Sequence, residues 1–189
     1  VRGNHDEAFD LAMNRGHVGD LPMHLYPGMK GKFTAESYGI IFSKDLEYNV
    51  MAASYKKLVP QKHKDFFAGL PLYYNIEMED RNYVIWHAGL GESCWFDILD
   101  MYKDDDLDMD HLIDAAAVDY KYNILWDHEG PNQYAEIPGF TQVVGHMPVQ
   151  YPYFSDNVIM CDTGCGHENR PLTAVILPDN IYTQVTDEG

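Results

Sequence analysis

The first third of the chain carries hydrophobic residues at helical spacing. Between residues 6 and 14 they follow one another at intervals of one, three and four, as Ala8, Phe9, Ala12 and Met13. Side chains three and four positions apart share one face of an α-helix, so residues 6–14 are predicted to form a short helix. The pattern returns over residues 44–58. Pro60 then begins a further predicted helix that extends to residue 68, because proline is tolerated in a first helical turn.

Two other segments have a different texture. Residues 16–31 are rich in glycine and proline, which predicts a loop that covers one rim of the domain. Residues 104–118 begin with acidic side chains and continue with an apolar stretch. Because negative charge near the first turn stabilises a helix, this second segment is predicted to be helical.

After Gly69 the chain changes to short runs rich in valine, isoleucine and tyrosine, which are typical of strands. Six strands are predicted, over residues 72–78, 83–86, 142–144, 158–161, 173–177 and 181–185. Helices precede and separate them, and the chain contains no repeat and no linker. The pattern therefore predicts a single layered α/β domain built on a β-sandwich and spanning residues 1–189.

The strongly negative net charge of the chain bears on which kinds of molecule it binds. The formal net charge is −17, from 30 acidic and 13 basic side chains, and no large basic cluster is present. This balance disfavours nucleic acid, whose phosphates are neutralised by lysine and arginine. No apolar run approaches the roughly 20 residues that span a bilayer, so no membrane association is expected.

The three cysteines are Cys94, Cys161 and Cys165, and they show no C-x-x-C spacing. An odd number without that spacing argues against a disulfide framework and against a structural zinc site. A reducing, cytoplasmic location is expected. Cys165 is expected to pack as a small hydrophobic residue in the turn after a strand.

Three polar motifs carry the candidate chemistry. Residues 3–6 (G-N-H-D) open the chain, and residues 86–89 (W-H-A-G) and 145–148 (G-H-M-P) each follow an apolar run. Glycine beside a strand end lets the backbone turn sharply and present an imidazole at the rim of a sheet. Two imidazoles and an amide oxygen suit a divalent cation such as Mn²⁺, Fe²⁺ or Zn²⁺. A single histidine at a strand end is more often a structural residue, and it is the combination that predicts a metal site.

With its flanking residues, each motif resembles a sequence block of the calcineurin-like metallophosphoesterases. Within them, the similarity is to the phosphoprotein phosphatase branch that also contains bacterial diadenosine tetraphosphatases. The resembling blocks are residues 2–6 (R-G-N-H-D), 65–74 (D-F-F-A-G-L-P-L-Y-Y), 85–90 (I-W-H-A-G-L), 145–148 (G-H-M-P), 162–165 (D-T-G-C) and 172–175 (L-T-A-V). They occur in the family's order over nearly the whole chain. Met147 departs from the family pattern, which has a small hydroxyl residue there.

The resemblance implies a fold, a set of ligands and a reaction. The fold is a four-layer α/β/β/α sandwich, of which residues 1–189 would be the C-terminal part without the N-terminal strands and helices. Asn4, His87 and His146 would ligate the second of two divalent metal ions, His5 would act as general acid, and Arg2 would lie near the phosphate. For Arg2, a structural role stays equally open. Two metals about 3.5 to 4 Å apart hold a hydroxide for in-line attack on a phosphoester.

Two departures limit what this sequence is expected to do. The family's upstream D-x-H and G-D-x-x-D-R-G blocks are absent, so the first metal's ligands and the carboxylate partner of His5 have no counterpart here. The chain by itself is therefore expected to be inactive, with at most one metal site partly retained. Residues 125–128 (L-W-D-H) resemble a family segment that carries a phosphate-binding arginine, and none is present. His128 or Asn132 would replace it, or the segment is a plain loop.

Three functions remain open at the level of sequence. The leading prediction is metal-dependent hydrolysis of phosphomonoesters, including phosphorylated proteins. The second is hydrolysis of a dinucleoside polyphosphate such as diadenosine tetraphosphate, because the D-T-G-C block also occurs in that branch. The third is a non-catalytic binding or scaffold module, in which some of the 14 tyrosines contact a partner. Restoring roughly 60 upstream residues is expected to give Mn²⁺-dependent hydrolysis of p-nitrophenyl phosphate, because two metal ions could then bind and activate the attacking hydroxide.

Overall fold

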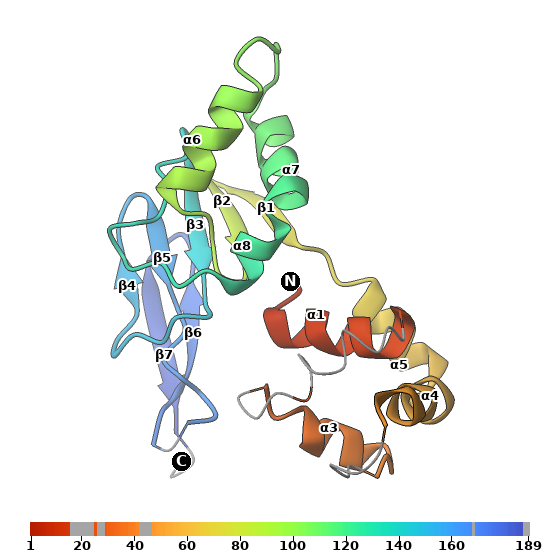
Figure 1. Cartoon of the computed structure of the whole chain (residues 1–189). Coiled ribbons are helices and arrows are strands. Elements are labelled where there is room, and N and C mark those ends of the chain that lie inside the picture. The colour runs from red at the N-terminus through yellow and green to blue at the C-terminus, as the bar shows by residue number, and fades with distance from the viewer. Residues whose placement is uncertain (16–24, 26–28, 42–46, 168, 187–189) are drawn as a thin grey trace. The chain divides into compact units, whose positions relative to one another are not determined.

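The computed structural model describes residues 1–15, 25, 29–41, 47–167 and 169–186. Within it the chain forms two compact units (Figure 1). One unit is Arg2–Leu70, here called the helical unit, and the other begins at Pro71 and is here called the sheet unit.

The helical unit is built from helices that surround one apolar cluster. Its helices are α1 (Asn4–Asp10), a π-helical turn (Leu11–Arg15), α3 (Gly31–Ser37), α4 (Tyr48–Leu58) and α5 (Gln61–Ala68). The cluster contains Phe9, Met13, Ala35, Met51 and Tyr55, among others, all buried. The apolar spacing seen in the sequence thus becomes the inward face of α1 and of the turn that continues it.

The sheet unit contains a five-stranded mixed sheet in the order β1-β2-β3-β5-β4 and a separate pair, β6-β7. The strands are β1 (Tyr73–Met78), β2 (Arg81–Trp86), β3 (Phe140–Val144), β4 (Tyr153–Phe154), β5 (Val158–Met160), β6 (Leu172–Ile176) and β7 (Ile181–Val185). Strands β2, β3 and β5 run parallel, while β1 and β4 are antiparallel to their neighbours. The carboxyl ends of three strands therefore meet at one edge of the sheet.

Opposite faces of this sheet are covered by different layers (Figure 1). On one face, Val84, Trp86 and Val144 pack with α6 (Glu92–Met101), α7 (Met109–Asp119) and α8 (Lys121–Trp126). On the other, Tyr83, Val143 and Ile159 pack against side chains of β6 and the residue that follows it. Alternate residues of a strand point to opposite faces, so each of these short strands contributes to two apolar clusters.

The mixed α/β fold predicted from the sequence is confirmed, and all six predicted strands are present within two residues of their expected limits. The helix predicted over residues 104–118 begins only at Met109, because Asp108 caps it by accepting a hydrogen bond from the backbone of His111 at 3.0 Å. Four described elements, α3, α6, α8 and β4, were not predicted. Of these, α3, α8 and β4 are short, whereas α6 has an apolar spacing like that of α4 and was missed.

Three further expectations bear on local structure. The predicted loop over residues 16–31 lies largely outside the described residues, as does the start of the helix predicted over 44–58, whose described part is α4. Cys165 is exposed, so the prediction that it packs in the turn is wrong; the turn places it in solvent. No helix in the described part of the chain is long and apolar enough to cross a membrane.

Candidate metal centre

The structure brings His87 and His146 together at the carboxyl edge of the sheet. His87 directly follows β2, and His146 follows β3 after a single glycine. Because β2 and β3 are parallel neighbours, their ends lie side by side. His87 Nε2 lies 3.1 Å from His146 Nδ1, with the two rings inclined at 62°. One ring nitrogen of each imidazole therefore faces one of the other.

Backbone contacts hold both histidines at this edge. The amide of Gly145 donates to the carbonyl of His87 at 2.8 Å, and the amide of Ala88 donates to the carbonyl of Ile124 at 2.7 Å. His146 itself has φ 63°, in the left-handed region that residues other than glycine seldom adopt. Such strained backbone persists where the surrounding structure holds it, and it concentrates at functional sites.

One more imidazole lies beside this pair of histidines, and an aspartate follows the next parallel strand at the same edge of the sheet. The ring of His128 stacks on that of His146, with centroids 5.1 Å apart and planes 12° from parallel. Asp162 follows β5 at the same edge of the sheet, and its Oδ1 accepts a hydrogen bond from the amide of Gly164 at 2.7 Å. The sequence analysis named His128 only as a replacement for an arginine, and Asp162 only as part of the 162–165 block, not as a site residue. The available signal was its position directly after a predicted strand.

The acidic loop after α8 adds negative charge near His128. Burial raises the pKa of the Glu129 carboxyl, and the neighbouring charge of Asp127 raises it further. Burial likewise raises the pKa of the Cys161 thiol, with Asp162 acting in the same direction. The pKa of an ordinary thiol already lies above neutral, so the shift keeps Cys161 protonated and not prepared to act as a nucleophile. The shift of Glu129 makes its carboxyl a weaker acid.

Chemically, the pair fits a divalent metal ion. Imidazole nitrogen is a good ligand for Mn²⁺, Fe²⁺ and Zn²⁺, and two such nitrogens facing each other can share either one proton or one metal ion. No group of three or more histidine, cysteine, aspartate and glutamate side chains suited to a metal is present among the described residues. The predicted set contains two histidines and an asparagine amide, so such a group is not required for it.

The remaining predicted site residues belong to the first turn of α1 in the helical unit. Asn4 is buried, and its Oδ1 accepts a hydrogen bond from the backbone amide of His5 at 3.0 Å. The imidazole of His5 is exposed. The Asp6 carboxylate accepts a hydrogen bond from the amide of Gly3 at 2.9 Å, which stabilises the start of the helix. The roles predicted for Asn4 and His5 stay predictions.

Arg2 is buried within the helical unit and bonded there. Its guanidinium donates to Glu7 Oε2 at 2.6 Å and to Asp10 Oδ2 at 3.3 Å. It also donates to the backbone carbonyls of Phe67 at 2.6 Å and Ala68 at 3.0 Å, at the end of α5. Four acceptors from both ends of the unit surround one cation, which favours the structural alternative over a contact with phosphate.

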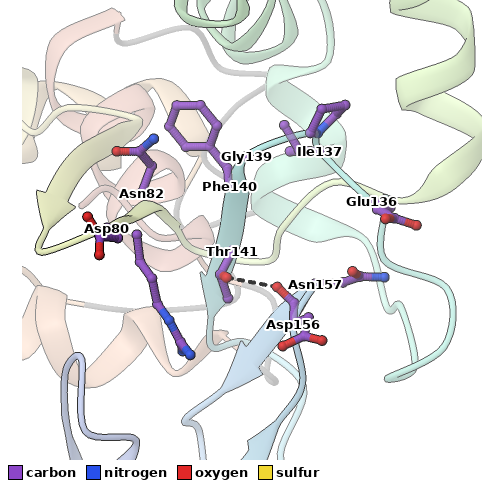
Figure 2. A pocket seen from close by; sticks show the side chains of 11 residues that line it. Asp80, Asn82, Glu136, Ile137, Gly139, Phe140, Thr141, Asp156 and Asn157 are labelled. Atoms are coloured by element: carbon purple, nitrogen blue, oxygen red, sulfur yellow. Dashed lines mark hydrogen bonds between the residues drawn. The ribbon is translucent and has the colours of Figure 1, made fainter.

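A cavity of about 290 Å³ lies at the opposite, amino edge of the parallel strands (Figure 2). Asp80, Glu136 and Asp156 are among the residues that line it, against a single arginine, Arg81. Thr141 Oγ1 donates to the backbone carbonyl of Asp156 at 2.8 Å beside it. Its excess of carboxylates disfavours a phosphoester, and ligands of open α/β sheets bind at the carboxyl ends of the strands. The histidine edge is therefore the better candidate for the chemistry.

Comparison of the sequence with protein-family models gave no match, and comparison with curated protein sequences gave none either.

Proposed function

We propose that this chain contributes to a metal-dependent phosphoesterase of the calcineurin-like type, with His87 and His146 as ligands of one divalent metal ion. The observation that carries the proposal is the distance of 3.1 Å between His87 Nε2 and His146 Nδ1, from residues 59 positions apart in the sequence. The order of the resembling sequence blocks supports the same family. The proposed fold of the whole enzyme is the four-layer α/β/β/α sandwich.

Each residue has a defined part in the proposed reaction. His87 and His146 hold the ion, and Asn4 is the proposed third ligand. A divalent ion bound there would act as a Lewis acid on a phosphoryl oxygen. His5 would donate a proton to the departing alkoxide, for which its exposed imidazole is suited. The proposed substrates are phosphomonoesters, including phosphorylated proteins.

The metal-binding half of the proposal is tested by titrating the chain with Co²⁺ and Zn²⁺. We expect one site whose Co²⁺ spectrum shows nitrogen ligation. His87→Ala and His146→Ala should each weaken binding by more than tenfold, because each removes one ligand. His111→Ala, which removes an exposed imidazole of α7 in the same unit, is the matched control and should leave the affinity unchanged. Equal affinity in all four proteins would overturn the proposal.

The enzymatic half is tested in a protein that also carries the D-x-H and G-D-x-x-D-R-G blocks. Mn²⁺-dependent release of phosphate from a phosphoserine peptide is expected. His5→Gln should lower kcat by about 10²–10⁴-fold, the usual contribution of a general acid. The loss should be smaller with p-nitrophenyl phosphate, whose leaving group needs less protonation. Absence of turnover with every divalent metal would contradict the enzymatic reading and leave metal binding to be judged separately.

A further inference from the structure

Gln142 is a fully buried polar residue in the middle of β3, with no exposed surface. The two residues that follow it on this strand, Val143 and Val144, are apolar and buried, as expected for a strand covered on both faces. Burying an amide side chain destabilises a fold unless hydrogen bonds replace those made with water. The contacts of Gln142 therefore indicate why an amide is present there.

All four hydrogen-bonding positions of the Gln142 amide are used. Oε1 accepts from the indole Nε1 of Trp86 and from the amide of Leu90, both at 2.9 Å. Nε2 donates to the carbonyl of Leu90 at 3.0 Å and to that of Ala135 at 2.9 Å. A glutamine amide offers two acceptor positions and two donors, so this set is complete. A carboxylate or an aliphatic side chain of the same length cannot reproduce it.

These partners bracket His87. Trp86 directly precedes it and Leu90 lies three residues after it, so Gln142 holds both ends of the segment 86–90 that carries the imidazole. Gln142 also lies on the strand that leads, four residues later, to His146. One side chain thus ties the loop of the first histidine to the strand of the second.

We infer that Gln142 is the positioning residue that aligns the imidazole of His87 with that of His146. The inference rests on the proposed function in one respect, that this pair holds a metal ion. Residues that orient metal ligands through hydrogen bonds change metal affinity without touching the metal. Gln142 acts here at both ends of the segment 86–90, through the indole of Trp86 at one end and the backbone of Leu90 at the other.

The test compares Gln142→Met with a control variant, Ile98→Ala. Ile98 lies on α6 in the apolar cluster that also contains Trp86 and Leu90, so its replacement removes apolar contacts but none of the hydrogen bonds to the segment 86–90. Both are titrated with Co²⁺ at a temperature at which each is fully folded by circular dichroism. Gln142→Met is expected to weaken Co²⁺ binding by about 10–100-fold and to alter its absorption spectrum. Ile98→Ala should bind within about threefold of the unsubstituted chain, with the same spectrum, because the loop keeps its bonds.

A second arm does not depend on metal. Nuclear Overhauser effects between the His87 and His146 rings in the metal-free chain should be lost in Gln142→Met and kept in Ile98→Ala. If the chain binds no metal, the proposed function fails while this arm still judges the positioning role. If Gln142→Met does not fold, Trp86→Phe removes one of the four hydrogen bonds and should show a smaller effect in the same direction. Unchanged ring contacts and unchanged affinity in the folded variant would overturn the inference.

Discussion

At the scale of single residues, Arg2 forms a buried network of hydrogen bonds and ion pairs inside the helical unit. Its guanidinium faces the carboxylates of Glu7 and Asp10 and the last carbonyls of α5. The C-terminal end of a helix carries partial negative charge, so a buried cation is favourable at this place. The side chains of Arg2 and Glu7 are each only 9% exposed, and water therefore screens this pair far less than it screens a surface pair.

Arg2→Met is expected to lower the unfolding free energy by about 3–5 kcal/mol, because two carboxylates and two carbonyls lose the cation that faces them. Urea unfolding followed by far-ultraviolet circular dichroism measures the loss. Lys32→Met is the matched control, since Lys32 pairs with Glu36 at 3.7 Å on the exposed surface of α3. It should cost no more than about 0.5 kcal/mol. Similar losses in the two variants would show that the Arg2 network contributes little.

Asp108 and His111 form a pH-dependent cap at the start of α7. Asp108 Oδ1 accepts from the backbone amide of His111 at 3.0 Å and lies 2.7 Å from its Nδ1. The hydrogen bonds from His111, first that of its amide, lower the pKa of Asp108 below its ordinary 3.8. The hydrogen bond to Asp108 raises the pKa of His111 above its ordinary 6.5.

The signs of these shifts define a pH window. The raised pKa of His111 stabilises the fold fully below about pH 6.5, and this contribution disappears as pH rises through the folded pKa. The lowered pKa of Asp108 stabilises the fold above about pH 3.8, and this contribution is lost as pH falls through the folded pKa. Nuclear magnetic resonance titration of His111 should therefore give a pKa above 6.5. Asp108→Asn should move it down, and an unchanged value in that variant would refute the pairing.

At the scale of elements, the segment between β2 and α6 depends on close packing of its backbone. Gly89 has φ 89°, and a Cβ placed there would lie 2.8 Å from Val144 Cγ1 and would also overlap the ring of Tyr134. Only glycine adopts this left-handed backbone without strain and also lets Val144 and Tyr134 approach the backbone this closely. This packing places the loop of His87 against β3, the strand that precedes His146.

Gly89→Ala is expected to destabilise the sheet unit by more than Gly139→Ala. Gly139 has a similar φ of 80°, but no described atom lies within 4 Å of a Cβ placed there. Gly139→Ala therefore reports the backbone strain alone, about 1–2 kcal/mol, while Gly89→Ala adds the steric overlap. Thermal unfolding of both variants measures the difference. Equal losses of stability in the two variants would mean that the residues around Gly89 move to accommodate the added methyl group without loss of stability.

At the scale of the whole molecule, the apolar clusters divide between the two units. The cluster around Phe9 and Tyr55 uses residues of the helical unit alone, and those on the two faces of the sheet use residues of the sheet unit alone. Proteins open in cooperative parts that often coincide with such clusters. A core substitution should therefore weaken its own unit first.

Hydrogen exchange can test this division. Met13→Ala, at a position 1% exposed in the helical unit, should accelerate amide exchange in α4 and α5 before it does so in β2 and β3. A loss of about 2–5 kcal/mol is typical for removal of a buried methionine side chain. Ile98→Ala in the sheet unit should show the reverse order. Uniform acceleration across both units in either variant would indicate a single cooperative core.

The amino-acid sequence by itself determined the local elements that have a strong apolar period and the histidines that are candidate metal ligands. The strands after Gly69 and the helix before Gly16 follow from apolar spacing, because local sterics and burial act within a few residues. The two histidines were recognisable because each follows an apolar run and has a glycine within two residues. The six-residue α8 was not predicted, since packing against the sheet stabilises so short a helix. The apolar spacing of α6 is like that of α4, and its absence from the prediction has no such reason.

Only the tertiary structure decided which distant groups meet. Parallel pairing of β2 with β3 brings His87 to His146, and no local pattern specifies which strands become neighbours. The same holds for Arg2, whose backbone acceptors lie 65 and 66 residues away, and for Gln142, whose bonds to Leu90 span 52 residues. Local preferences extend over a few residues, whereas such contacts form only when the whole chain buries its apolar faces together.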